Sequence, residues 1–214
     1  MRALPVLPAL AAAALWAAMA LAPALAQAVD CTQFNIKSTD SQPLGGSGQM
    51  PDTCKARMKN GFPIPDPDCT PGAINRTLTT KVLRDPDFRT SCVRDNVTTA
   101  SQKAGTYKLY AIPHPANNRG VMQTCELDHL VSLQLGGADT LDNIWPQCGP
   151  GRVVLIRRFF KQKDIVENFL ARQVKDGVID LADAQKGIAT DWTQFLEDAR
   201  KACNTEKCRE ALSD

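Results

Sequence analysis

The residue pair with the clearest chemical potential is Asp128–His129, which contains one of only two histidines in the chain. The aspartate offers a hard oxygen ligand for a divalent cation, and the imidazole has a pKa near neutrality. Metal-assisted hydrolysis of a phosphodiester needs both groups, a cation to neutralise developing charge and a base to take a proton from water. Neighbouring side chains on a strand point to opposite faces, so a pair acting on one substrate indicates a strand end or a bulge.

The alternation of apolar and polar residues predicts the element that carries this pair. Residues 122–135 have an extended pattern, in which Glu126 and Asp128 share one face and three leucines of opposite parity share the other. Gly136 and Gly137 follow directly and favour a turn. The pair is therefore expected on a strand that leads into a hairpin.

Helical periodicity begins only after this hairpin. The apolar residues of Phe159–Leu170 lie at helical spacing, and Gly177 is a typical helix end. A second helix is expected from an N-cap at Asp180 through to Phe195. Upstream, Tyr107–Ile112 alternates well enough for a strand. Short mixed elements, a hairpin and then two C-terminal helices predict an α+β fold.

Three strings around the pair follow one another at fixed spacing. They are Glu126-Leu127-Asp128-His129, Leu133-Gln134-Leu135-Gly136-Gly137 and Asn143-Ile144-Trp145-Pro146-Gln147. Together they resemble the signature of the HNH endonuclease family, the ββα-metal nucleases, and in particular a secreted bacterial branch of it. Further segments extend the resemblance over roughly residues 69–195: Cys69–Asn75, Lys163-Asp164 with Glu167-Asn168, and Ala184-Gln185 with Asp191-Trp192.

The resemblance implies a hairpin–helix core and a role for each matching residue. It makes His129 the general base that activates water and Asp128 a metal ligand. It makes Asn143 a brace between the hairpin and its loop, and Gly136 and Gly137 the hairpin turn. It also implies one divalent metal ion, for which carboxylate and imidazole ligands suit Mg, Mn, Zn or Ni.

The chain departs from the family pattern at the last metal ligand. The family places a His or Asn on the following helix, and by spacing that position falls near Phe160–Lys163, where this chain has neither. Asp164 is the nearest acceptor on the helix, and Glu126 shares a strand face with Asp128. Lys163 is a candidate for direct contact with phosphate. Either a different ligand keeps the site active, or the chain has kept the scaffold for binding.

Charge gives a weak indication of the partner. The formal net charge is +2, which is not the strongly basic balance of a protein that grips nucleic acid by charge alone. A local basic run follows the motif, comprising Arg152, Arg157, Arg158, Lys161 and Lys163. It fits a solvated helix face and equally a contact with phosphate, through Lys163, Arg157 and Arg158 in particular.

The N-terminal segment has the three parts of a secretory signal peptide. Arg2 precedes an apolar run to about Leu21, and small residues then offer cleavage near Ala26 or Ala28. An uncleaved membrane anchor is the competing interpretation, because roughly 20 apolar residues can span a bilayer. No later segment is apolar enough to span one. We therefore expect an exported protein, periplasmic or secreted, with no membrane attachment in its mature form.

All eight cysteines lie beyond the cleavage site, and behind an export signal they predict a disulfide framework. They are Cys31, Cys54, Cys69, Cys92, Cys125, Cys148, Cys203 and Cys208. The absence of any close CxxC pair argues against a zinc ribbon. Cys203 with Cys208 and Cys125 with Cys148 are reasonable pairings. The expected organisation is a signal peptide at 1–28, an irregular disulfide-pinned arm at 29–68 and an HNH nuclease-like domain at 69–214.

Three functions are consistent with these features. The first is a metal-dependent endonuclease that acts outside the cytoplasm on DNA, and in second place on RNA. The second is a non-catalytic secreted binding protein on the same scaffold, and the third is an enzyme acting on another envelope polymer. His114 lies between two prolines and is expected in an exposed turn rather than in a site. Trp145 is expected to be a packing anchor.

Overall fold

The computed structural model describes residues 29–94, 98–206 and 208, and the expected signal peptide lies outside them. Helices combine with small two-stranded antiparallel sheets, which confirms an α+β chain. The strands are β1 (Gln42–Pro43), β2 (Arg57–Lys59), β3 (Phe62–Ile64), β4 (Ala73–Ile74), β5 (Cys125–His129) and β6 (Ile144–Cys148). The helices are α1 (Thr80–Arg84), α2 (Ala100–Leu109), α3 (Phe159–Lys175), α4 (Leu181–Asp191) and α5 (Leu196–Lys201).

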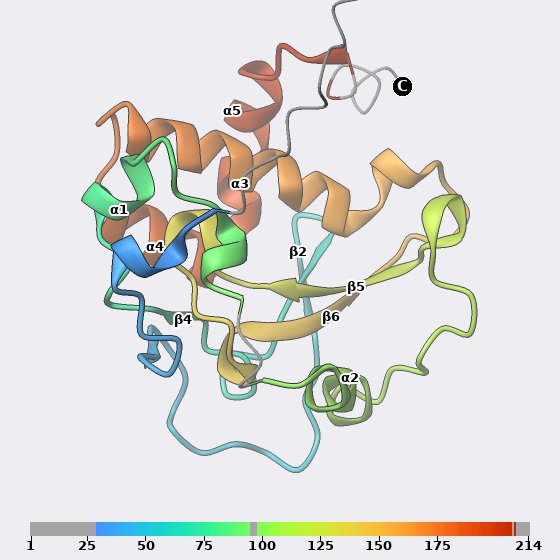
Figure 1. Ribbon diagram of the computed structural model, residues 1–214. Helices are drawn as coiled ribbons and strands as arrows, with labels where there is room; N and C mark the ends of the chain where they lie inside the picture. Colours follow the sequence, from blue (N-terminus) through green and yellow to red (C-terminus); the bar gives the residue numbers. More distant parts are fainter. Residues whose placement is uncertain (1–28, 95–97, 207, 209–214) are drawn as a thin grey trace, which may run out of the picture.

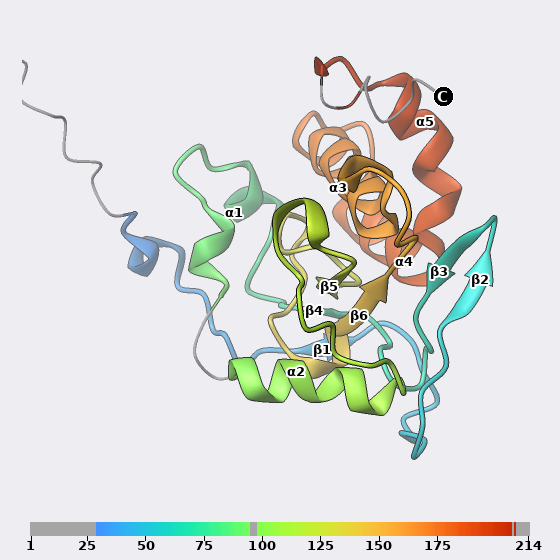
Figure 2. The same cartoon turned by 90° about the vertical axis from the view of Figure 1, so that its right-hand side faces the viewer.

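The β5–β6 hairpin lies at the centre of the fold. Its strands pair without a bulge from Cys125 opposite Cys148 to His129 opposite Ile144. The long helix α3 packs along one side of this hairpin, and α2 lies on the other (Figure 1). The view turned by 90° shows the same arrangement, with α4 and α5 grouped around α3 (Figure 2). The hairpin therefore presents one face to α3 and the other toward α2.

The turn after β5 depends on two glycines, as expected. Gly136 has φ = 77°, a left-handed conformation that strains other residues. A Cβ atom on Gly137 would lie 1.8 Å from the carbonyl oxygen of Val131, so only glycine fits there. The prediction of extended structure up to residue 135 was too long, because the strand ends at His129 and Leu133–Leu135 form a 3-10 turn.

The first C-terminal helix follows the predicted pattern. The side chains of Phe160, Val166 and Leu170 in α3 are buried, and Gly177 follows its end with φ = 74°. The second helix, α4, begins after Asp180 as expected but ends at Asp191.

Two C-terminal helices were predicted, whereas the described residues form three, because the second predicted helix is divided. The Asp191 side chain accepts hydrogen bonds from the backbone N–H and the hydroxyl of Thr193. These bonds favour the start of a new helical element at Asp191 over continuation of α4. The reason is that a side chain that caps the backbone competes with the hydrogen bonds of the helix. A 3-10 turn at Trp192–Phe195 and then α5 follow.

The strand predicted at Tyr107–Ile112 was also wrong, because the first half of this segment belongs to α2 and Tyr110 is the C-cap of that helix. The helix starts with a capping box, in which the side chains of Thr99 and Gln102 each bond the other's backbone N–H. Tyr107 and Tyr110 are both buried, three positions apart on one helix face. The alternation of apolar and polar residues that predicted a strand here therefore arises from the spacing of buried residues on a helix.

Four disulfides join all eight cysteines. They pair Cys31 with Cys92, Cys54 with Cys69, Cys125 with Cys148, and Cys203 with Cys208. The last two pairs confirm the pairings suggested by spacing. Within the described ranges, no helix is both long and apolar enough to cross a membrane.

The arm at residues 29–68 is less irregular than predicted. It contains the β2–β3 hairpin, and Ile64 at the end of β3 belongs to the main core together with Val166 and Trp192. The indole N–H of Trp192 donates to the carbonyl of Pro63 at 3.1 Å. The arm therefore packs on the C-terminal helices and shares their core.

Candidate functional site

Asp128 and His129 end β5, but their side chains diverge. Because β5 pairs regularly with β6, neighbouring side chains point to opposite faces of the hairpin. The Asp128 carboxylate meets the ammonium of Lys163 on α3, with Oδ2 and Nζ 2.9 Å apart. The His129 ring instead meets Asp139, with Nε2 and Oδ1 2.8 Å apart. Each residue therefore belongs to its own polar network.

The His129 network is a carboxylate–imidazole pair backed by a lysine. Asp139 is buried, and Lys103 of α2 donates to both of its carboxylate oxygens at 2.7 and 2.8 Å. Burial raises the pKa of Asp139, but hydrogen bonds from His129 and Lys103 outweigh it and lower the pKa to about 2. An ionised Asp139 accepts a hydrogen bond from Nε2–H, which assigns the remaining lone pair of a neutral ring to Nδ1.

The surroundings keep the His129 ring neutral near pH 7. Burial lowers the pKa of His129 below its ordinary value, and Asp139 opposes this shift without reversing it. The nearby guanidinium of the exposed Arg94 lowers the pKa further. The side chain retains 10% exposure, so a narrow edge of the ring is open to water. A neutral imidazole with one nitrogen held by a carboxylate is suited to accept a proton.

On the other face of the hairpin, Lys163 is fully buried, with 0% of its side chain exposed. Its ammonium lies 2.5 Å from Glu167 Oε1, and it donates to the main-chain carbonyl of His129 at 2.7 Å. The contact with Asp128 is an ion pair only, since Oδ2 is buried and accepts no well-directed hydrogen bond. Burial lowers the pKa of Lys163, but Asp128 and Glu167 raise it above its ordinary value, so the side chain stays charged.

Lys161 forms a second, more open charge cluster two residues nearer the start of α3. Its ammonium donates to Asp164 at 2.7 Å and lies 3.7 Å from Glu126. Burial raises the pKa of Glu126, and repulsion from Asp128 and Asp164 adds to the shift. Burial likewise raises the pKa of Asp164, although Lys161 opposes it. Glu126 and Asp128 thus lie on one face, as predicted, but different lysines neutralise them.

The residues expected to bind a divalent ion do not fit one as they stand. Asp128 pairs with Lys163, whereas Glu126 and Asp164 pair with Lys161. Across the described ranges, no three His, Cys, Asp or Glu side chains are placed to hold one ion. A carboxylate already neutralised by a buried ammonium has no charge left to attract a cation. The divalent ion stays a prediction.

Asn143 is fully buried and holds the loop that follows His129. Its Oδ1 accepts from the N–H groups of Val131 and Ala73 at 2.9 and 3.3 Å. Its Nδ2 donates to the carbonyls of Val131 and Ala138, both at 2.9 Å. This is the bracing position that the resemblance implied. Asn143 is a positioning residue, because its amide bonds the main chain and not a reacting group.

Two of the three residues expected to contact phosphate are buried. Lys163 is enclosed as described, and Arg158 is 4% exposed. The Arg158 guanidinium donates to the main-chain carbonyls of Gln123, Val121 and Val153. These arginine and lysine side chains therefore brace the fold, and their burial leaves neither of them open to a phosphate.

Two remaining predictions concern Arg157 and His114. Arg157, the third of these residues, is half-buried at the end of the 3-10 turn Leu155–Arg157. His114 is exposed as expected, with its ring edge-on to Tyr107 at 4.8 Å between centroids. It makes a suitable control position outside the candidate site.

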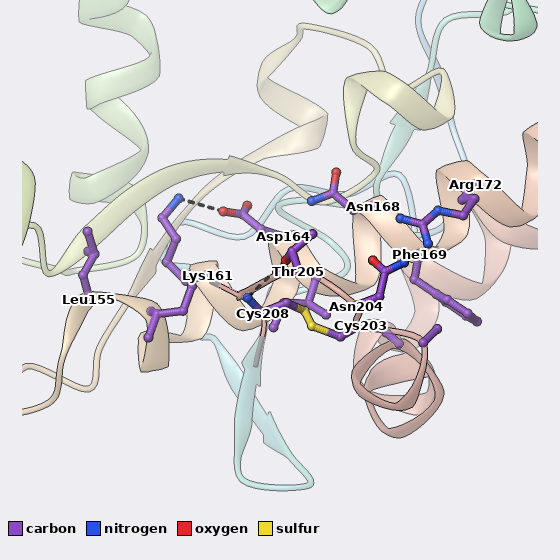
Figure 3. Close-up of a pocket in the computed structure, with 14 residues that line it drawn as sticks. Leu155, Lys161, Asp164, Asn168, Phe169, Arg172, Cys203, Asn204, Thr205 and Cys208 are labelled. Atoms are coloured by element: carbon purple, nitrogen blue, oxygen red, sulfur yellow. Dashed lines mark hydrogen bonds and ion pairs between the residues drawn. A yellow bond between two sulfur atoms is a disulfide. The ribbon is translucent and has the colours of Figure 1, made fainter. Parts of the chain in front are cut away.

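A cavity of about 710 Å³ lies between the outer side of α3 and the C-terminal segment (Figure 3). Lys161 and Asp164 line it, together with Arg172 and the Cys203–Cys208 disulfide. His129 is not among its lining residues. The cavity therefore adjoins the Lys161 cluster and not the imidazole.

Three residues of the site were not predicted from the sequence. Asp139 bonds the His129 ring, Lys103 bonds Asp139 and the charge of Arg94 acts on the ring, and none of the three belongs to the quoted motif strings. Asp139 lies two residues after Gly137, where a turn aspartate is unremarkable. Lys103 comes 36 residues earlier, and only folding brings it to Asp139.

Comparison with known proteins gives no independent assignment. No family model matches the chain, and neither does any curated protein or any solved structure. The HNH resemblance therefore rests on the sequence motifs alone.

Proposed function

We propose that this chain is an exported endonuclease that hydrolyses phosphodiester bonds in nucleic acid, DNA before RNA, with His129 as its general base. The observation that carries the proposal is the contact between the His129 Nε2 and the buried Asp139 carboxylate at the end of β5. A carboxylate that holds one ring nitrogen orients the other and stabilises the imidazolium once the proton has moved. The β5–β6 hairpin packed on α3, with Asn143 as its brace, also supports the proposal, because the resemblance implies a hairpin–helix core.

The proposed hydrolysis follows from the tautomer of His129, in which Nε2 carries the proton and Nδ1 has the free lone pair. Nδ1 of the neutral His129 takes a proton from a water molecule at the open edge of the ring. The water oxygen forms a bond to phosphorus, and the bond from phosphorus to the sugar oxygen breaks. The departing oxygen takes up a proton from solvent, and the imidazolium, paired with Asp139, later returns its proton to solvent. One product ends in a phosphate monoester and the other in a hydroxyl group.

The remaining features support an extracytoplasmic place of action. Four disulfides persist only in an oxidising environment. The N-terminal sequence predicts export. Arg94 supplies positive charge near His129, and such charge favours the approach of a phosphate.

The direct test is cleavage by the oxidised mature protein. Supercoiled plasmid DNA and single-stranded RNA are incubated with it, in a chelator and in Mg²⁺, Mn²⁺, Zn²⁺, Ni²⁺ or Ca²⁺. The proposal expects nicking of the plasmid in at least one of these conditions. Failure to cut either polymer in all of them would contradict it.

Asp139→Asn should lower the rate and shift its pH dependence. The rate should fall by about 100-fold or more, because the amide no longer stabilises the imidazolium. The general base acts in its neutral form, so activity is lost as the pH falls through the pKa of His129. Asp139 raises that pKa, so the acid limb of the variant should move to lower pH.

The measurement for this prediction is the pH profile of kcat/KM. Asp142→Asn is the matched control, since Asp142 lies in the same loop and bonds Ser41 and Thr140 instead. An acid limb that stays in place in Asp139→Asn would show that the carboxylate only supports the fold.

A non-catalytic binding protein is the second candidate. It is favoured by the failure of the expected metal ligands to converge and by the low exposure of the His129 ring. It predicts nucleic-acid binding without cleavage, and binding that His129→Ala leaves unchanged.

A further inference from the structure

The α3 position expected to carry the missing metal ligand is occupied by a buried cation. Lys163 is the last residue of the range Phe160–Lys163 in which the family places a His or Asn. Its ammonium faces Asp128, the other expected ligand, at 2.9 Å. Asp164, the acceptor proposed instead, is paired with Lys161. Adjacent helical residues point about 100° apart, so only one of them can face the strand.

Three oxygens surround the Lys163 ammonium: Glu167 and the His129 carbonyl accept its hydrogen bonds, and Asp128 forms an ion pair with it. The three oxygens come from Asp128, from Glu167 and from the main-chain carbonyl of His129, at 2.9, 2.5 and 2.7 Å. Two carboxylates and a carbonyl are also hard oxygen ligands of the kind that Mg²⁺ and Mn²⁺ prefer. The ammonium thus occupies the centre of an oxygen set that would otherwise suit a divalent ion.

We infer that Lys163 is a built-in counter-ion that takes the place of a divalent ion and holds the Asp128–His129 segment in position without one. Since its side chain is 0% exposed, it cannot touch a substrate. It contacts His129 through the main chain and leaves the ring to Asp139. Lys163 is therefore a positioning residue. The inference rests on the proposed function only where it concerns cleavage, because the binding of metal is measured separately.

The unmodified protein provides the first test. After dialysis against EDTA, the plasmid-nicking rate should stay within about twofold of the rate with added Mg²⁺ or Mn²⁺. Isothermal titration with Mn²⁺ should show no binding that depends on Asp128. Abolition of cleavage by EDTA and its restoration by Mn²⁺ would overturn the inference. So would Mn²⁺ binding that Asp128→Asn removes.

The second test removes the ammonium. Lys163→Ala frees Asp128, Glu167 and the His129 carbonyl, and should bind Mn²⁺ at least about tenfold more tightly than the unmodified protein. Its residual cleavage should become sensitive to EDTA, which a merely structural lysine would not cause. Lys175→Ala, on the exposed last turn of the same helix, is the matched control and should change neither readout.

The outcomes separate the inference from the proposed function. Unchanged Mn²⁺ affinity in a folded Lys163→Ala protein would overturn the inference. If circular dichroism shows that this variant does not fold, the titration of the unmodified protein decides alone. If the unmodified protein cuts no nucleic acid, the proposed function fails, whereas the Mn²⁺ comparison still tests the role of Lys163.

Discussion

Replacing His129 by alanine should reduce phosphodiester cleavage by about 100- to 10,000-fold, the range typical for loss of a general base. The reason is chemical, because His129 is the side chain that Asp139 orients as a proton acceptor. The expected measurement is the initial rate of plasmid nicking at pH 7.5 by oxidised protein. His129→Gln should lose as much, since an amide cannot take up the proton.

The control for this variant is the second histidine. His114 is exposed and contacts the ring of Tyr107, so His114→Ala should keep the full rate. Near-ultraviolet circular dichroism should show that all three proteins are folded. Cleavage by a folded His129→Ala protein at the original rate would remove His129 from the chemistry.

The second large effect should be on stability. Asn143→Ala removes four hydrogen bonds and leaves two main-chain N–H groups and two main-chain carbonyls without partners in a fully buried place. Each unpaired buried group costs about 1–3 kcal/mol, and some of that cost is recovered by relaxation or water. We therefore expect the free energy of unfolding to fall by about 3–5 kcal/mol, which is exceptional for one substitution.

Urea unfolding of the oxidised protein measures this effect. The matched control is Asn168→Ala, because Asn168 is exposed and makes one side-chain contact, with Gln134 at 3.2 Å. It should cost less than about 0.5 kcal/mol. A similarly small loss in Asn143→Ala would mean that water or a rearranged loop satisfies the freed groups, and Asn143 would not be the brace.

The local pattern of apolar residues and glycines was sufficient to predict the secondary-structure elements that position the site. Leucine spacing and two glycines located the strand that carries Asp128 and His129 and the turn after it, although they placed the end of that strand six residues too late. Helical spacing and Gly177 identified α3. These features depend on residues near one another in the chain, which is what hydropathy periodicity records. The prediction of a strand at Tyr107–Ile112 was wrong because it used the same local periodicity over too short a segment. Six residues are too few to distinguish a period of 2 from one of 3.6.

The local sequence pattern could not predict which side chains contact one another inside the site. Asp164 was favoured as a ligand over its neighbour Lys163, because carboxylates bind metals and lysines do not. The rotation of α3 decides the question, and it is set by the buried side chains of Phe160 and Val166. Similarly, Asp139 and Lys103 meet only because α2 packs beside the hairpin.

The most direct test of the central claim is the nitrogen NMR spectrum of His129, recorded with ¹⁵N-histidine. The chain has two histidines, so the two rings can be assigned with His114→Ala. At pH 7.5 the account predicts that the Nε2 of His129 carries the proton and that Nδ1 is bare. It predicts that a non-hydrolysable phosphorothioate oligonucleotide shifts the Nδ1 signal and leaves that of His114 in place. A protonated Nδ1, or a signal that does not respond to an oligonucleotide the protein binds, would contradict it.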